Sequence, residues 1–173
     1  MKKIYLTIFQ EIKDWINFFL RNIPGKIGVL LRKFIYFFNT KGYNNVSIPT
    51  GFFFDTLKSV SFGKNVSLGF FCHFYSKGGE IILKDNIKLN INVVLNSSIG
   101  GKIIIGKNSL IGPNVIMRTA NHNFERIDLK INSQGHNFGN IIIDEDVWIG
   151  ANSIILGDVK IGKGAIIGAR QHF

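Results

Sequence analysis

The sequence predicts an all-β fold, a parallel β-helix of hexapeptide repeats preceded by a short N-terminal helical segment. An aliphatic or aromatic residue begins each of 14 six-residue units, and glycine follows it directly in 7 of them. In 9 of the units Asn, Asp or Gly stands three places after the apolar residue, and these residue types tolerate the positive φ of a tight corner. The composition, 46% hydrophobic with 19 Gly, is too apolar for a disordered chain and too rich in glycine for a helical bundle. The 14 apolar residues are Phe62, Leu68, Phe74, Leu83, Leu89, Leu95, Ile105, Ile111, Met117, Ile143, Ile149, Ile155, Ile161 and Ile167.

A period of six has a direct geometric meaning. Each unit forms one short strand and one corner, so three units close a triangular coil of 18 residues, and stacked coils pair as parallel strands about 4.8 Å apart. An amphipathic helix does not produce this period, because six is not a multiple of 3.6. The corner residues that we expect at positive φ are Asn65, Asn86, Asn92, Asn108, Asn114, Asp146, Asn152, Asp158 and Gly164.

The interruptions of the repeat predict the domain organisation. Between Met117 and Ile143 the register jumps by 26 residues, so an insertion of 20 residues leaves the β-helix as a protruding loop over residues 122–141. Long loops in compact domains are commonly functional. We predict a β-helix domain over residues 46–173 and a separate helical segment over residues 1–45.

The N-terminal segment has two interpretations, which the sequence leaves open. Apolar residues recur at helical spacing on both sides of Pro24-Gly25, and 8 Lys/Arg against Glu11 and Asp14 give residues 1–45 a net charge of +6. The pair of helices is either a cap packed on the β-helix or an amphipathic pair that contacts a membrane surface through residues 1–40. The apolar positions are Ile4, Ile8, Ile12, Trp15, Ile16 and Phe19, then Ile27, Leu30, Leu31, Phe34, Ile35 and Phe38, with Lys26, Arg32 and Lys33 between the latter.

Several classes of protein are excluded by pattern and composition. The sequence holds no run of 18 uncharged apolar residues, so we expect no membrane-spanning helix and a cytoplasmic location, at the inner face of the cytoplasmic membrane if the helices bind lipid. One cysteine, Cys72, excludes a disulfide framework and is expected to be a small core residue. Because no helix-turn-helix and no aromatic-basic platform accompany the positive charge, we expect no nucleic-acid partner.

Histidines are the residues best suited to catalysis. His122 stands at the root of the predicted loop and His136 lies within it. A neutral imidazole on a rigid scaffold is suited to act as a general base at neutral pH. From position alone, an ordinary surface histidine is the commoner interpretation of a histidine in a loop.

Three stretches of the sequence resemble a known family. Residues 111–124 (IGPNVIMRTANHNF), the loop end NSQGH and residues 141–169 (IIIDEDVWIGANSIILGDVKIGKGAIIGA) are similar to the hexapeptide-repeat acyltransferases, in particular the maltose/galactoside O-acetyltransferase branch and its relatives that modify surface polysaccharides. The resemblance covers about residues 46–169. It implies a left-handed β-helix, a homotrimer with its sites between neighbouring chains, acetyl-CoA as co-substrate and a saccharide hydroxyl as acceptor.

The same resemblance implies roles for individual residues. The family's catalytic histidine falls on His122, which would take the proton of the acceptor hydroxyl as it attacks the thioester. The acceptor-binding Asn falls on Asn90 or Asn92, of which we prefer Asn90, and His136 is a second candidate for the acceptor site. For CoA the implied residues are Trp148, Gly150, Ala151, Gly168 and Ala169, with Lys160, Lys163 or Arg170 as candidate phosphate contacts and Glu125 or Asp128 as candidate partners of a histidine.

Two expectations concern what the sequence lacks. No pair of histidines has the spacing of the β-helical carbonic anhydrases, so we expect no metal. The family continues past Ala169 with a further partial coil and an arm, whereas this sequence ends Arg170-Gln171-His172-Phe173, so we expect an uncovered last coil and a less complete CoA site. The alternative to an O-acetyltransferase is therefore a non-catalytic β-helix, either a binding module or a truncated pseudoenzyme; a third hypothesis is transfer to a sugar amine.

Overall fold

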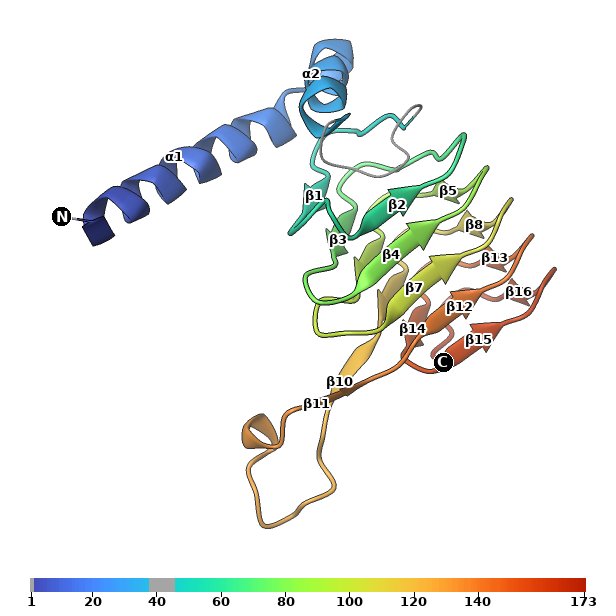
Figure 1. Cartoon of the computed structure of the whole chain (residues 1–173). Helices are drawn as coiled ribbons and strands as arrows, with labels where there is room; N and C mark the ends of the chain where they lie inside the picture. The colour runs from blue at the N-terminus through green and yellow to red at the C-terminus, as the bar shows by residue number, and fades with distance from the viewer. Residues whose placement is uncertain (1, 38–45) are drawn as a thin grey trace.

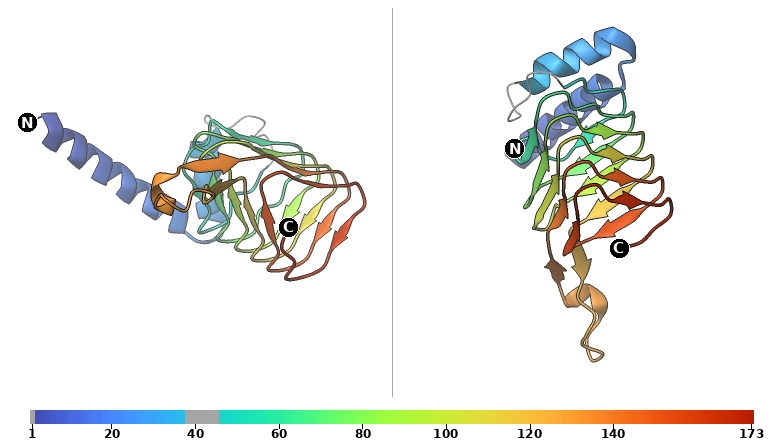
Figure 2. Two further views of the ribbon diagram at one scale, coloured as in Figure 1. Left: turned by 90° about the horizontal axis from the view of Figure 1, so that it is seen from below. Right: turned by 90° about the vertical axis from the view of Figure 1, so that its right-hand side faces the viewer.

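The computed structural model describes residues 2–37 and 46–173, which form a parallel β-helix with two helices at its N-terminal end (Figure 1). Residues 38–45, which include Phe38 and the end of the predicted segment 1–45, lie outside the described residues. Helix α1 spans Lys2–Asn22 and helix α2 spans Gly25–Phe37. The helices lie at one end of the stack of coils and the C-terminus at the other (Figure 2). The prediction of an all-β parallel β-helix with an N-terminal helical segment is confirmed.

Three parallel sheets form the sides of the β-helix. The first sheet contains β2 (Val60–Phe62), β4 (Glu80–Leu83), β7 (Lys102–Ile105), β12 (Ile141–Ile143) and β15 (Val159–Ile161). The second sheet contains β5 (Lys88–Leu89), β8 (Leu110–Ile111), β13 (Trp148–Ile149) and β16 (Ile166–Ile167). The third sheet contains β1 (Phe53–Phe54), β3 (His73–Tyr75), β6 (Val94–Asn96), β9 (Ile116–Arg118) and β14 (Ile154–Leu156). The winding agrees with the left-handed β-helix that the family resemblance implies.

The predicted apolar residues stack in three inward columns, one per sheet. In the first sheet Phe62 pairs with Leu83, Leu83 with Ile105, Ile105 with Ile143, and Ile143 with Ile161, which follows it by 18 residues. All 14 residues are buried except Ile167 of the last coil, which is partly buried. The second column is Leu89, Ile111, Ile149 and Ile167, and the third is Phe54, Phe74, Leu95, Met117 and Ile155. Burial of these columns provides the apolar stabilisation of the fold.

The corners follow the predicted chemistry. All nine residues that we expected at positive φ adopt it, from +55° at Asn65 to +72° at Gly164. The Asn side chains also bond from coil to coil: Asn92 Nδ2 donates to Asn114 Oδ1 at 2.9 Å, and Asn114 Nδ2 donates to Asn152 Oδ1 at 3.1 Å. Each corner Asn thus accepts the left-handed backbone and binds its neighbour.

Two replacements of one ladder residue should separate the contribution of its positive φ from that of its hydrogen bonds to the neighbouring coils. Asn114→Ala should lower the free energy of unfolding by about 2 kcal/mol, about half from a non-Gly residue forced to positive φ and half from the lost hydrogen bonds. Asn114→Gly, which keeps the backbone conformation, should lose only about 1 kcal/mol. Urea unfolding of both variants measures the difference, and equal losses would contradict a role for φ.

Arg32 of α2 joins the helices to the β-helix. Its buried side chain donates from Nε to the Ile48 carbonyl at 2.9 Å and from Nη1 to the carbonyls of Leu20 and Ile23, each at 2.9 Å. The backbone amide of Gly51 donates to the Arg21 carbonyl at 2.9 Å. A cation therefore satisfies carbonyls at the C-terminal end of α1 and ties both helices to the first coil. None of the described helices is long and apolar enough to cross a membrane.

The C-terminal residues form the third side of the last coil, and β15 and β16 of that coil are edge strands of their sheets, in line with the expectation of an uncovered last coil. His172 forms a parallel bridge with Ile154 of β14, and the Ile154 amide donates to the Gln171 carbonyl at 2.8 Å. The Leu156 amide donates to the Phe173 carbonyl at 2.6 Å. The third sheet therefore continues onto these last residues, because their backbone extends along the edge of β14.

Candidate functional site

The insertion after β9 begins and ends as an antiparallel hairpin that projects from the β-helix (Figure 1). Strand β10 spans Ala120–His122, β11 spans His136–Phe138, and a single 3-10 turn spans Ile131–Ser133 between them. His122 and His136 are direct partners in this pairing. Their rings lie 4.1 Å apart between centroids, tilted by 39°, and both side chains are exposed. The two histidines singled out in the sequence therefore form one solvent-accessible pair at the hairpin's base.

The base of the hairpin is held by the preceding coil. Thr119 Oγ1 donates to the Gly100 carbonyl at 2.6 Å, and the Gly139 amide donates to the Thr119 carbonyl at 2.9 Å. Gly101 has φ +76°, and a Cβ there would lie 2.3 Å from the Gly139 carbonyl oxygen, so no larger residue fits this approach. The histidine pair thus stands on a rigid support.

Gln134 organises the loop beyond the histidines, a role that the sequence motif NSQGH did not reveal. Its Nε2 donates to the carbonyls of Arg126 (2.8 Å) and Leu129 (3.1 Å), while its Oε1 accepts from the Arg126 amide at 3.1 Å. Such amide-to-backbone bridges depend on the loop's path, so no sequence pattern predicts them.

The loop carboxylates have partners of their own. Arg126 Nε donates to Asp128 Oδ1 at 3.1 Å, and this hydrogen bond lowers the pKa of Asp128 below its ordinary value. The Glu125 carboxylate accepts from the Phe124 amide at 3.2 Å. Within the described residues neither carboxylate bonds a histidine, so the structure does not bear out their suggested role as histidine partners.

A shallow hollow of about 360 Å³ lies over the second sheet. Trp148 lines it with 52% of its surface exposed, and Asn90 and Leu110 line it too. Trp148 pairs in register with Leu110 on one side and Ile166 on the other, and both are exposed. Leu110 and Ile166 extend this apolar strip; the alternation of the hexapeptide places them outward, although the sequence analysis did not single them out.

The candidate CoA residues gather at the corner between the second and third sheets. The column directly after the second sheet's inward residues is Gly69, Asn90, Gly112, Gly150 and Gly168. A Cβ on Gly150 would lie 2.6 Å from the Ala169 amide nitrogen, so this position requires glycine. Ala151 accepts from the Arg170 amide at 2.9 Å. Asn90 is therefore the one member of this column that carries a side chain, because the other four are glycines.

The structure separates the two candidate asparagines. Asn92 has φ +56° and its amide belongs to the corner ladder. Asn90 is exposed and lines the hollow, and its Oδ1 accepts a hydrogen bond from the adjacent Ile91 amide at 2.7 Å. Of the two, Asn90 thus lines the hollow, whereas Asn92 belongs to the corner ladder.

The histidine pair and the hollow lie at different corners of the triangular β-helix. Asn90 and Gly150 precede strands of the third sheet, whereas His122 follows that sheet's strand β9. Because the strands of the third sheet are parallel, residues that precede its strands and residues that follow them lie at opposite ends of those strands, and so on two different sides of the sheet. One chain therefore brings together the members of each group, but not the two groups.

The candidate phosphate contacts fall into two places. Lys160 lies 3.9 Å from an oxygen of Asp144, and Lys163 lies 3.5 Å from an oxygen of Glu145, so both cations are paired with acids. Arg170 stands at the corner beside Gly150. Among the described residues no group of three or more His, Cys, Asp or Glu side chains is arranged to hold a metal ion.

Cys72 is a core residue, as predicted. It is fully buried, and its Sγ donates to the Asn90 carbonyl at 3.1 Å. Burial raises the pKa of the thiol from its usual 9.0 to about 11. The thiol therefore stays protonated at neutral pH and is a poor nucleophile.

This shift predicts a loss of stability at alkaline pH. Between about pH 9 and 11 the unfolded chain loses the thiol proton while the native chain keeps it, so rising pH favours unfolding. The contribution is complete below about pH 9 and falls by roughly 1.4 kcal/mol per pH unit above it. Denaturant unfolding of the native chain and Cys72→Ala across this range isolates the thiol, because all other groups are shared. Parallel pH curves for the two proteins would contradict it.

Comparison with known proteins agrees with this architecture. Residues 140–170 match the family model described as bacterial transferase hexapeptide (six repeats). The chain is 32% identical over 131 residues to a dTDP-4-amino-4,6-dideoxy-D-glucose acyltransferase of Escherichia coli, covering 72% of this chain and 67% of that protein. It is 35% identical over 98 residues to a galactoside O-acetyltransferase of Lactococcus lactis, covering 56% and 45%. A structure of AntD, an N-acyltransferase from Bacillus cereus, has the same fold, with a TM-score of 0.67, 21% identity and coverage of 82% and 77%.

The fold and these relationships define the class of protein. The chain belongs to the hexapeptide-repeat transferase family. It spans 45% of the length of the Lactococcus relative and 31% of a putative acetyltransferase of Schizosaccharomyces pombe that it also matches.

Proposed function

We propose that the protein is an acyltransferase that moves an acetyl group from acetyl-CoA to a hydroxyl of a saccharide, such as a surface polysaccharide or its precursor. The observation that carries this proposal is the exposed His122–His136 pair on a rigid hairpin base. Relatives named as galactoside O-acetyltransferases support the reaction class. Because acetyl-CoA is an intracellular metabolite, we propose a cytoplasmic location.

In the proposed mechanism His122 is the general base. A sugar hydroxyl is a weak nucleophile, so a neutral imidazole takes its proton as the oxygen attacks the thioester carbonyl. The tetrahedral intermediate then collapses, the carbon–sulfur bond breaks, and the leaving thiolate receives the proton from the imidazolium. His136, whose ring contacts that of His122, is a positioning residue and a contact for the acceptor. The reaction needs no covalent enzyme intermediate and no metal.

The proposed CoA surface is the hollow over the second sheet. Its apolar strip around Trp148 supports a site for the pantetheine arm, because an exposed aromatic ring offers apolar contact to a flexible chain. Gly150, Ala151, Gly168 and Ala169 present backbone there, and Asn90 supplies an amide toward the acceptor. We propose that a membrane surface is a further partner of residues 1–40.

We further propose that the site forms between chains of a homotrimer. The separation supports this: Trp148 lies in the second sheet and Asn90 just before the third, whereas His122 follows the third, so a neighbouring chain would supply the missing group. Mixing His122→Ala and Trp148→Ala chains after unfolding should restore activity. With random assembly about a quarter of the sites receive both native residues. Activity that stays at the level of the separate variants would place each site within one chain.

The proposed reaction is tested by thiol release from acetyl-CoA. The purified chain is incubated with acetyl-CoA alone and then with neutral sugars, nucleotide sugars and oligosaccharides. We expect release that requires a saccharide acceptor and an acetylated product of matching amount. Neither acetyl-CoA binding nor release with any acceptor would favour a non-catalytic β-helix instead.

Transfer to a sugar amine is the second candidate function. The relative that covers 72% of this chain is named as an acyltransferase of an amino sugar. A neutral amine is already a good nucleophile, so it depends less on a base than a hydroxyl does. Assays with matched amino and hydroxy sugars separate the two: acylation of the amino sugar alone would replace the O-acetyltransferase proposal.

A further inference from the structure

We propose that helices α1 and α2 dock the chain on an anionic lipid bilayer, with their outward apolar faces inserted at the membrane interface. The inference goes beyond acyl transfer and is tested without it. It begins from the way in which α1 is turned.

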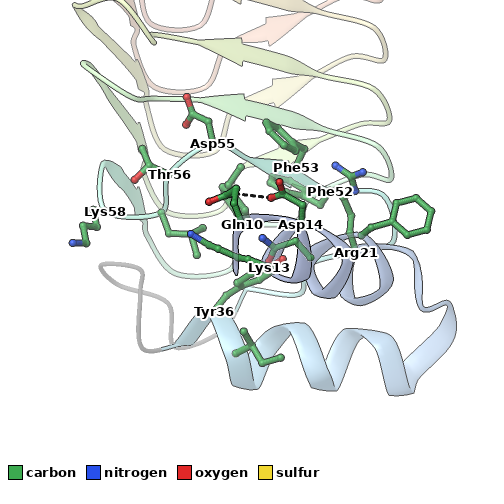
Figure 3. A pocket seen from close by; sticks show the side chains of 15 residues that line it. Gln10, Lys13, Asp14, Arg21, Tyr36, Phe52, Phe53, Asp55, Thr56 and Lys58 are labelled. Carbon is green, nitrogen blue, oxygen red and sulfur yellow. Dashed lines mark hydrogen bonds between the residues drawn. The ribbon is translucent and has the colours of Figure 1, made fainter. Parts of the chain in front are cut away.

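Helix α1 directs its polar stripe toward the β-helix. A cavity of about 640 Å³, lined by both polar and apolar residues, lies between that stripe and the first coil (Figure 3). Gln10 Nε2 donates to Asp14 Oδ1 at 2.9 Å, and the Arg21 guanidinium lies 5.6 Å above the Phe53 ring. The stripe that lines the cavity consists of Gln10, Lys13, Asp14, Asn17 and Arg21.

The apolar face of α1 consequently points away from the protein. In a soluble domain an amphipathic helix packs its apolar face on the core. Here Phe9 and Trp15 are 70% and 59% exposed, and their neighbours on that face are more than half exposed as well. The exposed face consists of Tyr5, Ile8, Phe9, Ile12, Trp15, Ile16 and Phe19.

Helix α2, like α1, directs polar residues toward the β-helix and apolar residues away from it. Its charged Arg32 is buried against the β-helix, whereas Ile27, Leu30 and Phe34 are each 65–71% exposed on the outer side. Lys26 and Lys33 are exposed next to them. Both helices therefore present apolar surface outward, at the end of the β-helix opposite the C-terminus (Figure 2).

Composition favours a bilayer over a second copy of the chain. The seven outward residues of α1 span an arc of roughly 120°, at 100° per residue, which is wider than a coiled-coil seam. Four of the seven are aromatic, whereas a and d positions favour Leu, Ile and Val. Aromatic faces with nearby lysines are typical of helices that lie in the headgroup region. The net charge of +6 on residues 1–45 complements an anionic surface.

The first experiment measures insertion directly. The chain has two tryptophans, so Trp148→Phe leaves Trp15 as the only tryptophan, which excitation near the red edge of indole absorption selects over tyrosine. We expect its emission to shift to the blue with vesicles of phosphatidylglycerol and phosphatidylcholine, and to be quenched by brominated acyl chains. Binding should weaken with added salt and be much weaker on phosphatidylcholine alone. An emission spectrum that the anionic vesicles leave unchanged would overturn the proposal.

Matched variants then locate the surface. In vesicle co-sedimentation of the full chain, Trp15→Gln/Phe19→Gln should weaken binding about tenfold or more, because two aromatic side chains no longer leave water. Phe70→Gln, which removes an exposed aromatic residue of the β-helix, should bind like the native chain. Lys26→Gln/Lys33→Gln should reduce binding to anionic vesicles only.

Sedimentation without lipid tests whether a second copy of the chain, and not a bilayer, covers the apolar face. If the Trp15→Gln/Phe19→Gln change lowers the oligomeric mass and the native chain ignores vesicles, the face is a contact between copies and the proposal is wrong. Native-like vesicle binding by this variant would also overturn it. Acetyl transfer enters none of these readouts, so failure of the enzyme proposal would leave the result intact.

Discussion

His122→Ala should reduce acceptor-dependent release of CoA by roughly 10²- to 10⁴-fold in kcat, the usual contribution of a general base. The side chain is exposed at the hairpin base, so its removal should leave the fold and acetyl-CoA binding unchanged. His122→Asn should be as inactive, because an amide forms hydrogen bonds but does not accept the proton. The measurement is steady-state thiol release with the best acceptor from the panel.

The controls for this prediction use the other histidines. His172→Ala, which alters an exposed residue at the chain's last bridge, should retain activity. His136→Ala should lose less kcat than His122→Ala and raise the acceptor KM, as expected of a positioning residue. A His122→Ala chain with activity within a few-fold of the native chain would assign the base elsewhere.

Arg32→Ala should lower the free energy of unfolding of the N-terminal unit by about 3 kcal/mol, since buried carbonyls lose a charged donor. Those carbonyls belong to Leu20, Ile23 and Ile48, so the change should loosen α1, α2 and the first coil together. Arg32→Lys should not restore stability, because one ammonium group lacks the planar fork that reaches carbonyls on two elements. Lys33→Ala, at the exposed neighbouring residue, should be nearly neutral.

Hydrogen exchange resolves where Arg32→Ala acts. We expect faster exchange of the amides of α2, of Gly51 and of the C-terminal turn of α1. Amides of the central coils, such as Ile103 and Ile141, should exchange as in the native chain, because coils depend mainly on their nearest neighbours. Uniform acceleration along the whole β-helix would instead make Arg32 part of the global fold. Unchanged exchange at α2 would contradict its anchoring role.

The candidate site was only partly predictable. His122 and His136 were named from the sequence, but their pairing depends on the register of β10 with β11, which closes a loop whose sequence has no repeat. Between Asn90 and Asn92 the sequence favoured Asn90 without deciding, because Leu95 and Ile105 stand ten residues apart instead of six and this interruption makes the count between coils ambiguous. The structure separates them since only Asn92 adopts positive φ and joins the corner ladder.

For the N-terminal helices the sequence predicted the elements but not their orientation. Their helical spacing was evident in the sequence, and so was their charge. The sequence left open which side of α2 meets the β-helix, and the structure shows Arg32 buried while Ile27, Leu30 and Phe34 are exposed. Periodicity identifies the two faces of a helix but does not state which face meets the protein.

The sequence by itself determined the β-helix, its three inward columns and its corners. Each hexapeptide carries its own apolar residue and its own turn residue, so this information is local and is repeated along the chain. Only the tertiary structure decided at which corner of the β-helix the histidines lie, where Trp148 lies relative to them, and which faces of α1 and α2 meet the β-helix. Those relations arise from contacts between segments far apart in the chain, such as Arg32 with Ile48, and a local pattern does not encode them.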